Sequence, residues 1–143
     1  MAYTSGLFLN NKVGFKIASV DVSDHVTAFQ LNRKADQIEV SAMGDTAHKF
    51  VTGLSADTIT VSFLNDRGAG EILATLQSNY GTTVAFSAIQ VSDEPVAATN
   101  KLYTGYILID NVIDINGAVA DEATFDLTFT CNSKTELAST GTW

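Results

Sequence analysis

Cysteine, proline and basic residues are scarce in this sequence, and each shortage narrows what the protein can be. Cys131 is the single cysteine, so no disulfide can form within one chain, and Pro95 is the single proline. No apolar run approaches the roughly 18 residues that span a bilayer, and residues 1–13 lack the pattern of a secretory signal. These absences fit synthesis and assembly in a reducing cytoplasm.

The shortage of positive charge bears on possible partners. Eight Lys and Arg stand against sixteen Asp and Glu, which gives a formal net charge of -8. Because proteins hold nucleic acid mainly through Lys and Arg contacts with phosphate, this balance disfavours stable binding to DNA or RNA. Two interpretations stay open: the acidic surface keeps the protein soluble, or it prevents adhesion to a polyanion.

What the chain does contain is enough apolar material for a folded core. Hydrophobic residues make up 45% of the 143 residues and charged residues 17%, which is too apolar for a disordered chain. The length suits one domain better than two, so we expect a single domain over residues 1–143.

Alternation with a period of two dominates the chain. From Thr58 to Phe63 apolar and hydroxylated residues alternate, and Phe125 to Cys131 repeats the pattern more strongly. Such alternation is typical of a strand with one buried face and one wet face. Further strands are expected at 15–20, 26–31, 37–41, 82–90 and 102–109.

One segment has a helical period instead. Its apolar face would carry Ile72, Leu73, Leu76 and Tyr80. Asp66 is a candidate cap ahead of it, and Gly81 can end the helix in the left-handed conformation, so we expect a helix of about three turns over Ala69–Tyr80. The predicted fold is mainly β, an antiparallel β-sandwich or barrel of about seven strands with one flanking α-helix.

Two long connections interrupt the strands. Ala42–Ala56 has two glycines and no periodicity, and it exceeds the usual 2–5 residues of a hairpin loop, so its length suggests a function. Asn111–Ala123 is the other, and its Asn116-Gly117 dipeptide suits a two-residue hairpin turn.

No arrangement of residues predicts catalysis or a cofactor. His25 and His48 lack a companion spaced for metal or nucleophile chemistry, and Cys131 ends a strand on its apolar side like a small core residue. Gly68-Ala69-Gly70 precedes a helix, but Leu73 stands where a dinucleotide fingerprint needs its third glycine. We therefore expect no enzyme activity, no catalytic residue and no cofactor.

A metal site has only a weak signal. Residues 114–117 resemble part of a calcium loop, but the flanking ligand positions fall on Val112 and Ala123, which cannot serve. A low-affinity ion on Asp110, Asp114 and Asp121 stays open, while solvated acids in a hairpin are the simpler account. We expect no resident metal.

Several short motifs over residues 21–87 resemble the major tail proteins of long-tailed bacteriophages. They are, in order, Ser23-Asp24-His25-Val26, Arg33-Lys34-Ala35-Asp36, Ala42-Met43-Gly44-Asp45-Thr46, Gly53-Leu54-Ser55 and the helical segment GAGEILATLQSNYG. Beyond residue 87 the resemblance rests on strand order and general character.

The resemblance implies a structural protein of the virion tail, assembled in the host cytoplasm. It also implies a β-sandwich with a flanking helix, because subunits of that family have this fold. Those subunits close into six-membered rings, and the rings stack into a hollow tube for DNA passage. The partners implied are further copies of this chain, other tail proteins and DNA as transient cargo, with no membrane. Edge strands of neighbouring copies would continue one another's sheets, which removes exposed edges.

Within that assembly, residues of the long connection would reach the adjacent subunit or ring: Met43, Gly44, Asp45, Thr46, Ala47, His48, Lys49, Phe50, Val51 and Thr52. A second group would line the lumen: Gln37, Glu39, Ser41, Thr58, Thr60 and Ser62. The alternative for this second group is that it faces bulk solvent. Deleting residues 45–52 is expected to leave a folded monomer that cannot polymerise.

Two alternative functions remain at this point. A tail-terminator or head–tail joining ring would share the sandwich and the acidic balance, but it would stop at one ring. A carbohydrate-binding sandwich of a host-recognition fibre would display exposed aromatic platforms, whereas Tyr103 and Tyr106 fall on alternate faces of one strand.

Overall fold

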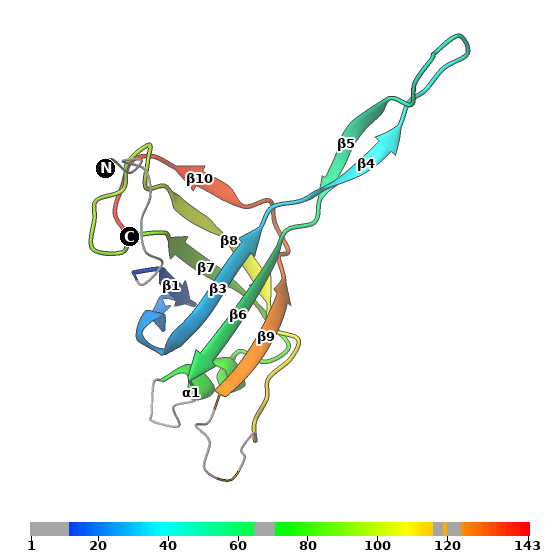
Figure 1. The fold of residues 1–143 in the computed structure, drawn as a ribbon. Helices are drawn as coiled ribbons and strands as arrows, with labels where there is room; N and C mark the ends of the chain where they lie inside the picture. The colour runs from blue at the N-terminus through cyan, green and yellow to red at the C-terminus, as the bar shows by residue number, and fades with distance from the viewer. Residues whose placement is uncertain (1–11, 65–70, 116–118, 120–123) are drawn as a thin grey trace.

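Two antiparallel sheets and a projecting two-stranded arm make up the molecule (Figure 1). The computed structural model describes residues 12–64, 71–115, 119 and 124–143. Within these ranges, sheet A has the strand order β10-β8-β7-β1-β2, sheet B has the order β3-β6-β9, and β4 pairs only with β5. The predicted mainly β, antiparallel fold is confirmed.

The strands of sheet A are β1 (Gly14–Ile17), β2 (Val20–Asp21), β7 (Thr83–Ile89), β8 (Leu102–Leu108) and β10 (Glu136–Ala138). Those of sheet B are β3 (Val26–Asn32), β6 (Thr58–Leu64) and β9 (Thr124–Thr130). The arm consists of β4 (Ala35–Glu39) and β5 (Phe50–Ser55) with the turn between them.

The core lies between the two sheets and follows from the alternation in sequence. Ile59, Val61 and Phe63 of β6 are at most 1% exposed, and they pair across the ladder with Phe129, Leu127 and Phe125 of β9. Phe15, Ile17 and Phe86 meet them from sheet A. Each large apolar side chain buried in this way contributes about 1.5–3 kcal/mol.

The sandwich is closed along one side and open along another. Near β9 the sheets meet, because Ile107 bridges to Cys131 and the Asn132 amide donates to the Tyr106 carbonyl at 2.8 Å. Strand β3, by contrast, pairs only with β6 among the described residues and leaves its other edge without a ladder partner. This open edge matters for the surfaces described below.

The helix is shorter than predicted. α1 spans Ile72–Ser78, and the expected cap Asp66 lies outside the described residues. At its end, the Asn79 side chain donates to the Thr75 carbonyl at 2.8 Å, and Gly81 has the predicted left-handed backbone with a φ of 80°. No helix among the described residues is both long and apolar enough to cross a membrane.

The single strand expected at residues 15–20 is in fact a hairpin. Ala18 and Ser19 have φ values of 50° and 69° and form a two-residue turn between β1 and β2. Such turns favour Asn-Gly because both central residues have positive φ, so Ala-Ser carries no sequence signal for one. In this hairpin Ile17 pairs with Val20 across the turn, and the Ile17 side chain lies in the core.

The expectation of an aperiodic loop over Ala42–Ala56 is half wrong. Residues 50–55 form β5, with Glu39 opposite Phe50, Ile38 opposite Val51 and Gln37 opposite Thr52. Neither face of this strand is buried, so its sequence does not alternate between apolar and polar residues. A register shift also breaks the pairing next to Ala35.

Candidate functional site

The arm projects away from both sheets (Figure 1). It carries an apolar face that no other described element covers. Ile38 and Val51 lie opposite each other in the register, and Val40 continues the same face two residues on. Their side chains are 51%, 49% and 48% exposed. Gly53 lies beneath Ile38, since a Cβ there would stand 3.1 Å from the Ile38 Cδ1 atom. The result is a flat apolar surface, which we call the apolar arm face.

The opposite face of the arm is polar. It presents Gln37, Glu39 and Thr52, together with Phe50, which lies opposite Glu39. Leu54 of β5 is also 81% exposed. His48 Nδ1 lies 2.7 Å from the Glu39 carboxylate, and the His48 and Phe50 rings are 6.4 Å apart. The arm is therefore an amphipathic ribbon without a buried side.

The tip of the arm is a defined turn. The Asp45 carboxylate accepts hydrogen bonds from the Ala42 amide at 2.7 Å and from Lys49 Nζ at 2.8 Å. The hydrogen bond from the Ala42 amide, with that from Lys49, lowers the pKa of Asp45 below its ordinary value. Met43 is fully exposed at this tip, and Gly44 turns the chain with a φ of 93°.

Asp57 joins the arm to the body. It is 3% exposed, and its carboxylate accepts the Lys34 amide at 3.0 Å and the Thr135 amide at 2.9 Å. Its backbone carbonyl also accepts the Cys131 amide at 3.0 Å. Burial by itself raises the pKa of Asp57, but the amides of Thr135 and Lys34 and the charge of Arg33 outweigh it and lower the pKa overall.

Sheet B turns a polar face outward. Thr60 lies between Gln30 on β3 and Thr128 on β9, and Ser62 lies opposite Asp126. None of the three strands contains Lys or Arg. This outer face is thus lined by hydroxyls, amides and a carboxylate, with no cation from its own strands.

The two groups of expected lumen residues lie on different elements. Thr58, Thr60 and Ser62 share the outer face of sheet B, while Gln37 and Glu39 lie on the polar face of the arm with Ser41 just beyond β4. The structure gathers each group on one surface but does not join them within one chain.

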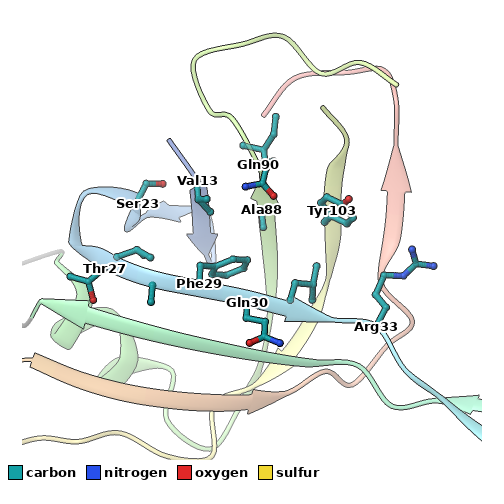
Figure 2. Close-up of a pocket in the computed structure, with 13 residues that line it drawn as sticks. Val13, Ser23, Thr27, Phe29, Gln30, Arg33, Ala88, Gln90 and Tyr103 are labelled. Atoms are coloured by element: carbon teal, nitrogen blue, oxygen red, sulfur yellow. The ribbon is translucent and has the colours of Figure 1, made fainter. Parts of the chain in front are cut away.

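A groove runs along the open edge of β3, and Figure 2 shows Phe29 on β3 facing sheet A, where Ala88 and Tyr103 also line the groove. Its volume is about 900 Å³. The Phe29 ring lies 4.9 Å from the Phe15 ring of β1, measured between ring centres. Phe29, Leu31 and Tyr103 are only partly buried, because the described part of sheet B ends at β3 and no described element covers this part of sheet A. Arg33 stands at its rim, and no acidic residue lines it among the described residues.

The residues with catalytic potential are not gathered into one site. His25 Nδ1 lies 2.8 Å from Asp24 Oδ1, and His25 Nε2 lies 3.7 Å from Glu71 Oε2. His48 lies on the arm, far from both acids in sequence. Burial, with the nearby charge of Asp57, raises the pKa of Cys131 to about 11, so its thiol is protonated at neutral pH.

The acids of the weak calcium signal meet amide donors instead. Asp114 accepts Gln77 Nε2 at 2.8 Å and Asp110 accepts Asn111 Nδ2 at 2.7 Å, while Asp121 lies outside the described residues. In the described part of the chain, no three His, Cys, Asp or Glu side chains gather as metal ligands do. The predicted Asn116-Gly117 turn and the Gly68-Ala69-Gly70 segment also lie outside the described residues.

Sequence reasoning missed three features: the buried Asp57, the apolar arm face and the groove. Asp57 follows Ser55-Ala56, a sequence typical of an exposed turn, so the neighbouring residues do not indicate that it is buried. Ile38 and Val40 read as the buried side of an ordinary strand. An available signal was that Phe50-Val51-Thr52 has high β-propensity within the supposed loop.

Comparisons with known proteins agree with this fold. No protein-family model matches the sequence, and no curated protein matches it significantly. Among solved structures, a chain of a native gene transfer agent virion has a TM-score of 0.72 at 12% identity, covering 92% of this chain and 99% of that chain. A chain from the tail of an empty gene transfer agent particle with C6 symmetry has a TM-score of 0.60 at 13% identity, covering 80% and 82%. The chain therefore shares its fold with a chain of a gene transfer agent virion and a chain of a gene transfer agent tail, which agrees with the resemblance in sequence.

Proposed function

We propose that this protein is a tail tube subunit, which closes into hexameric rings that stack into a hollow, DNA-conducting tube. The observation that carries the proposal is the shared fold with a chain of a C6-symmetric tail, covering 80% of this chain. Three features of the described residues support it: β3 has an edge without a ladder partner, no other described element covers the arm, and the polar outer face of sheet B carries no Lys or Arg from its own strands.

The outer face of sheet B is the proposed wall of the lumen. A wall of hydroxyls and carboxylates forgoes the counterion release that drives proteins onto DNA, so DNA slides past without arrest. Thr58, Thr60 and Ser62 belong to this wall. Gln37, Glu39 and Ser41 form a second polar surface on the arm, and we assign them to the lining where one ring meets the next.

The arm is the proposed contact between subunits. Residues 43–52 cover its tip and the first half of β5, and Met43, Phe50 and Val51 are half or fully exposed there. Apolar surface of this kind without a partner marks an interaction site. A neighbouring subunit or ring would cover it.

Negative-stain electron microscopy of the purified protein over a range of concentrations tests the tube. We expect long hollow tubes of uniform width. Isolated rings that never stack would support a tail-terminator instead, and monomers at every concentration would count against self-assembly.

Cysteine labelling tests which face lines the lumen. Thr60→Cys places a thiol on the outer face of sheet B, and Ala85→Cys places one on the exposed face of β7 in sheet A. A bulky maleimide should label both monomers, but in tubes only the Ala85→Cys variant. Equal labelling of both variants in tubes would show that sheet B does not face the lumen.

A further inference from the structure

Two surfaces of the described chain expose apolar side chains that no described element covers. One is the apolar arm face, and the other is the groove, where Phe29, Leu31 and Tyr103 lie among polar residues. The two surfaces cannot meet within one chain. The arm projects away from the sandwich from the end of β3 and the start of β6 (Figure 1). The groove lies between β3 and sheet A (Figure 2). Each surface exposes apolar atoms to water at a free-energy cost that contact with the other would remove. A second copy can bring them together.

We propose that the apolar arm face of one subunit seats in the β3 groove of a neighbouring copy, an inference that rests on the proposed assembly of this chain with itself. Ile38, Val40 and Val51 would lie against Phe29, Leu31 and Tyr103. The polar face of the same arm would then stay in contact with water.

Charge supports this choice of occupant. The arm holds three carboxylates, Asp36, Glu39 and Asp45, against the single Lys49. The groove offers Arg33 and no acid among the described residues. Asp36 lies on the same face as Ile38, since a Cβ at Gly53 would contact both side chains, so it can reach a cation at the groove's rim.

Such a contact is head-to-tail, because different surfaces of the two copies meet. It repeats from copy to copy and closes a ring or continues a filament. A protein with a damaged arm and a protein with a damaged groove therefore each keep one working surface, and together they can form one contact and no more.

Substitutions on opposite faces of the same strand test the contact with matched controls. Val51→Asp damages the apolar arm face, and Ser55→Asp changes the opposite face near the root of the arm. Leu31→Asp damages the groove, and Asn32→Asp changes the outer side of the same strand. We expect Val51→Asp and Leu31→Asp to raise the concentration needed for polymers at least about tenfold, and both controls to leave it nearly unchanged. An equimolar mixture of Val51→Asp and Leu31→Asp should form heterodimers in analytical ultracentrifugation.

Cross-linking keeps the test valid if Leu31→Asp fails to fold. The double variant Val51→Cys/Leu31→Cys should give a ladder of cross-linked multimers with a short bifunctional maleimide, against little background from the buried Cys131. Thr52→Cys/Leu31→Cys and Val51→Cys alone should give no ladder. Equal ladders from both double variants, or none from either, would overturn the assignment.

The outcomes separate this inference from the proposed tube. Tubes that form as readily with Val51→Asp as with the natural sequence would sink the docking contact and leave the tube standing. Heterodimers and a specific ladder of cross-linked multimers from a protein that never forms tubes would support the docking contact and contradict the proposed tube.

Discussion

At the scale of single residues, Asp57 has the greatest influence on how the molecule is joined. Its carboxylate accepts hydrogen bonds from the Lys34 amide at the root of the arm and from the Thr135 amide in the β9–β10 connection, 23 and 78 residues away in sequence. A buried carboxylate with two amide donors is stable only while both partners remain, which makes this position sensitive to substitution.

Asp57→Ala should lower the free energy of unfolding by about 1–3 kcal/mol for each of the two amides left without an acceptor. Urea denaturation followed by circular dichroism measures this. Asp36→Asn, an exposed acid on the arm, is the control and should stay within about 0.5 kcal/mol of the natural protein.

The same residue gives a pH dependence with a definite sign. Because folding lowers the pKa of Asp57 below 3.8, the unfolded chain binds more protons, and stability falls as the pH falls below that value. The stability difference between the natural protein and Asp57→Asn should therefore shrink from about pH 5 to about pH 3. A constant difference over that range would show that the charge of Asp57 plays no part.

Gly14 is the second sensitive residue. A Cβ there would stand 2.6 Å from Cζ2 of Trp143, and Lys16 Nζ lies 4.3 Å from the centre of the same indole. Gly14 thus makes room for the C-terminal tryptophan on β1.

Gly14→Ala should displace Trp143, destabilise the protein by about 1–3 kcal/mol and shift the tryptophan fluorescence to longer wavelength. In a Trp143→Ala background the same substitution should cost much less. Equal costs in the two backgrounds would contradict the contact, since a double-mutant cycle measures the coupling of neighbours.

At the scale of elements, the arm is separable from the fold. No residue of 35–55 belongs to the described core, and β4 and β5 pair only with each other in the described chain. Deleting residues 45–52, as the sequence suggested, would remove half of β5 and leave β4 without its partner. Removing the whole arm is the cleaner test.

Replacing residues 35–55 with Asn-Gly should leave a folded monomer that cannot form tubes. Lys34 and Ala56, the residues that the new turn would join, are already hydrogen-bonded at 2.7 Å, so a two-residue hairpin fits between them. We expect Tm to change by less than about 4 °C while polymers disappear. Tubes from the shortened protein would show that the arm is dispensable for assembly.

At the scale of the whole molecule, the charge of -8 opposes association of identical copies. Salt shortens the range of this repulsion from about 30 Å at 0.01 M to about 10 Å at 0.1 M. The concentration needed for tubes should therefore fall as NaCl rises over this range, measured by light scattering and sedimentation. A rise instead would mean that attractive ion pairs, such as one between Asp36 and Arg33, dominate assembly.

How far the sequence predicts the molecule depends on how local each feature is. The alternation in β6 and β9 decides by itself which residues are buried, because a strand presents successive side chains to opposite faces whatever its neighbours are. The helix near Ile72 and the left-handed Gly81 are equally local. For these elements the prediction was right to within a few residues.

Only the tertiary structure decided which apolar residues would lack a cover and which acid would be buried. Ile38 and Val40 alternate with polar residues just as Ile59 and Val61 do, yet one pair lies on a projecting arm and the other in the core. Asp57 is buried because Lys34 and Thr135 converge on it from distant segments. Burial depends on what packs against a residue, and contacts between distant segments form only in the folded chain, so the sequence determined the faces of the strands and the fold determined which faces remain free.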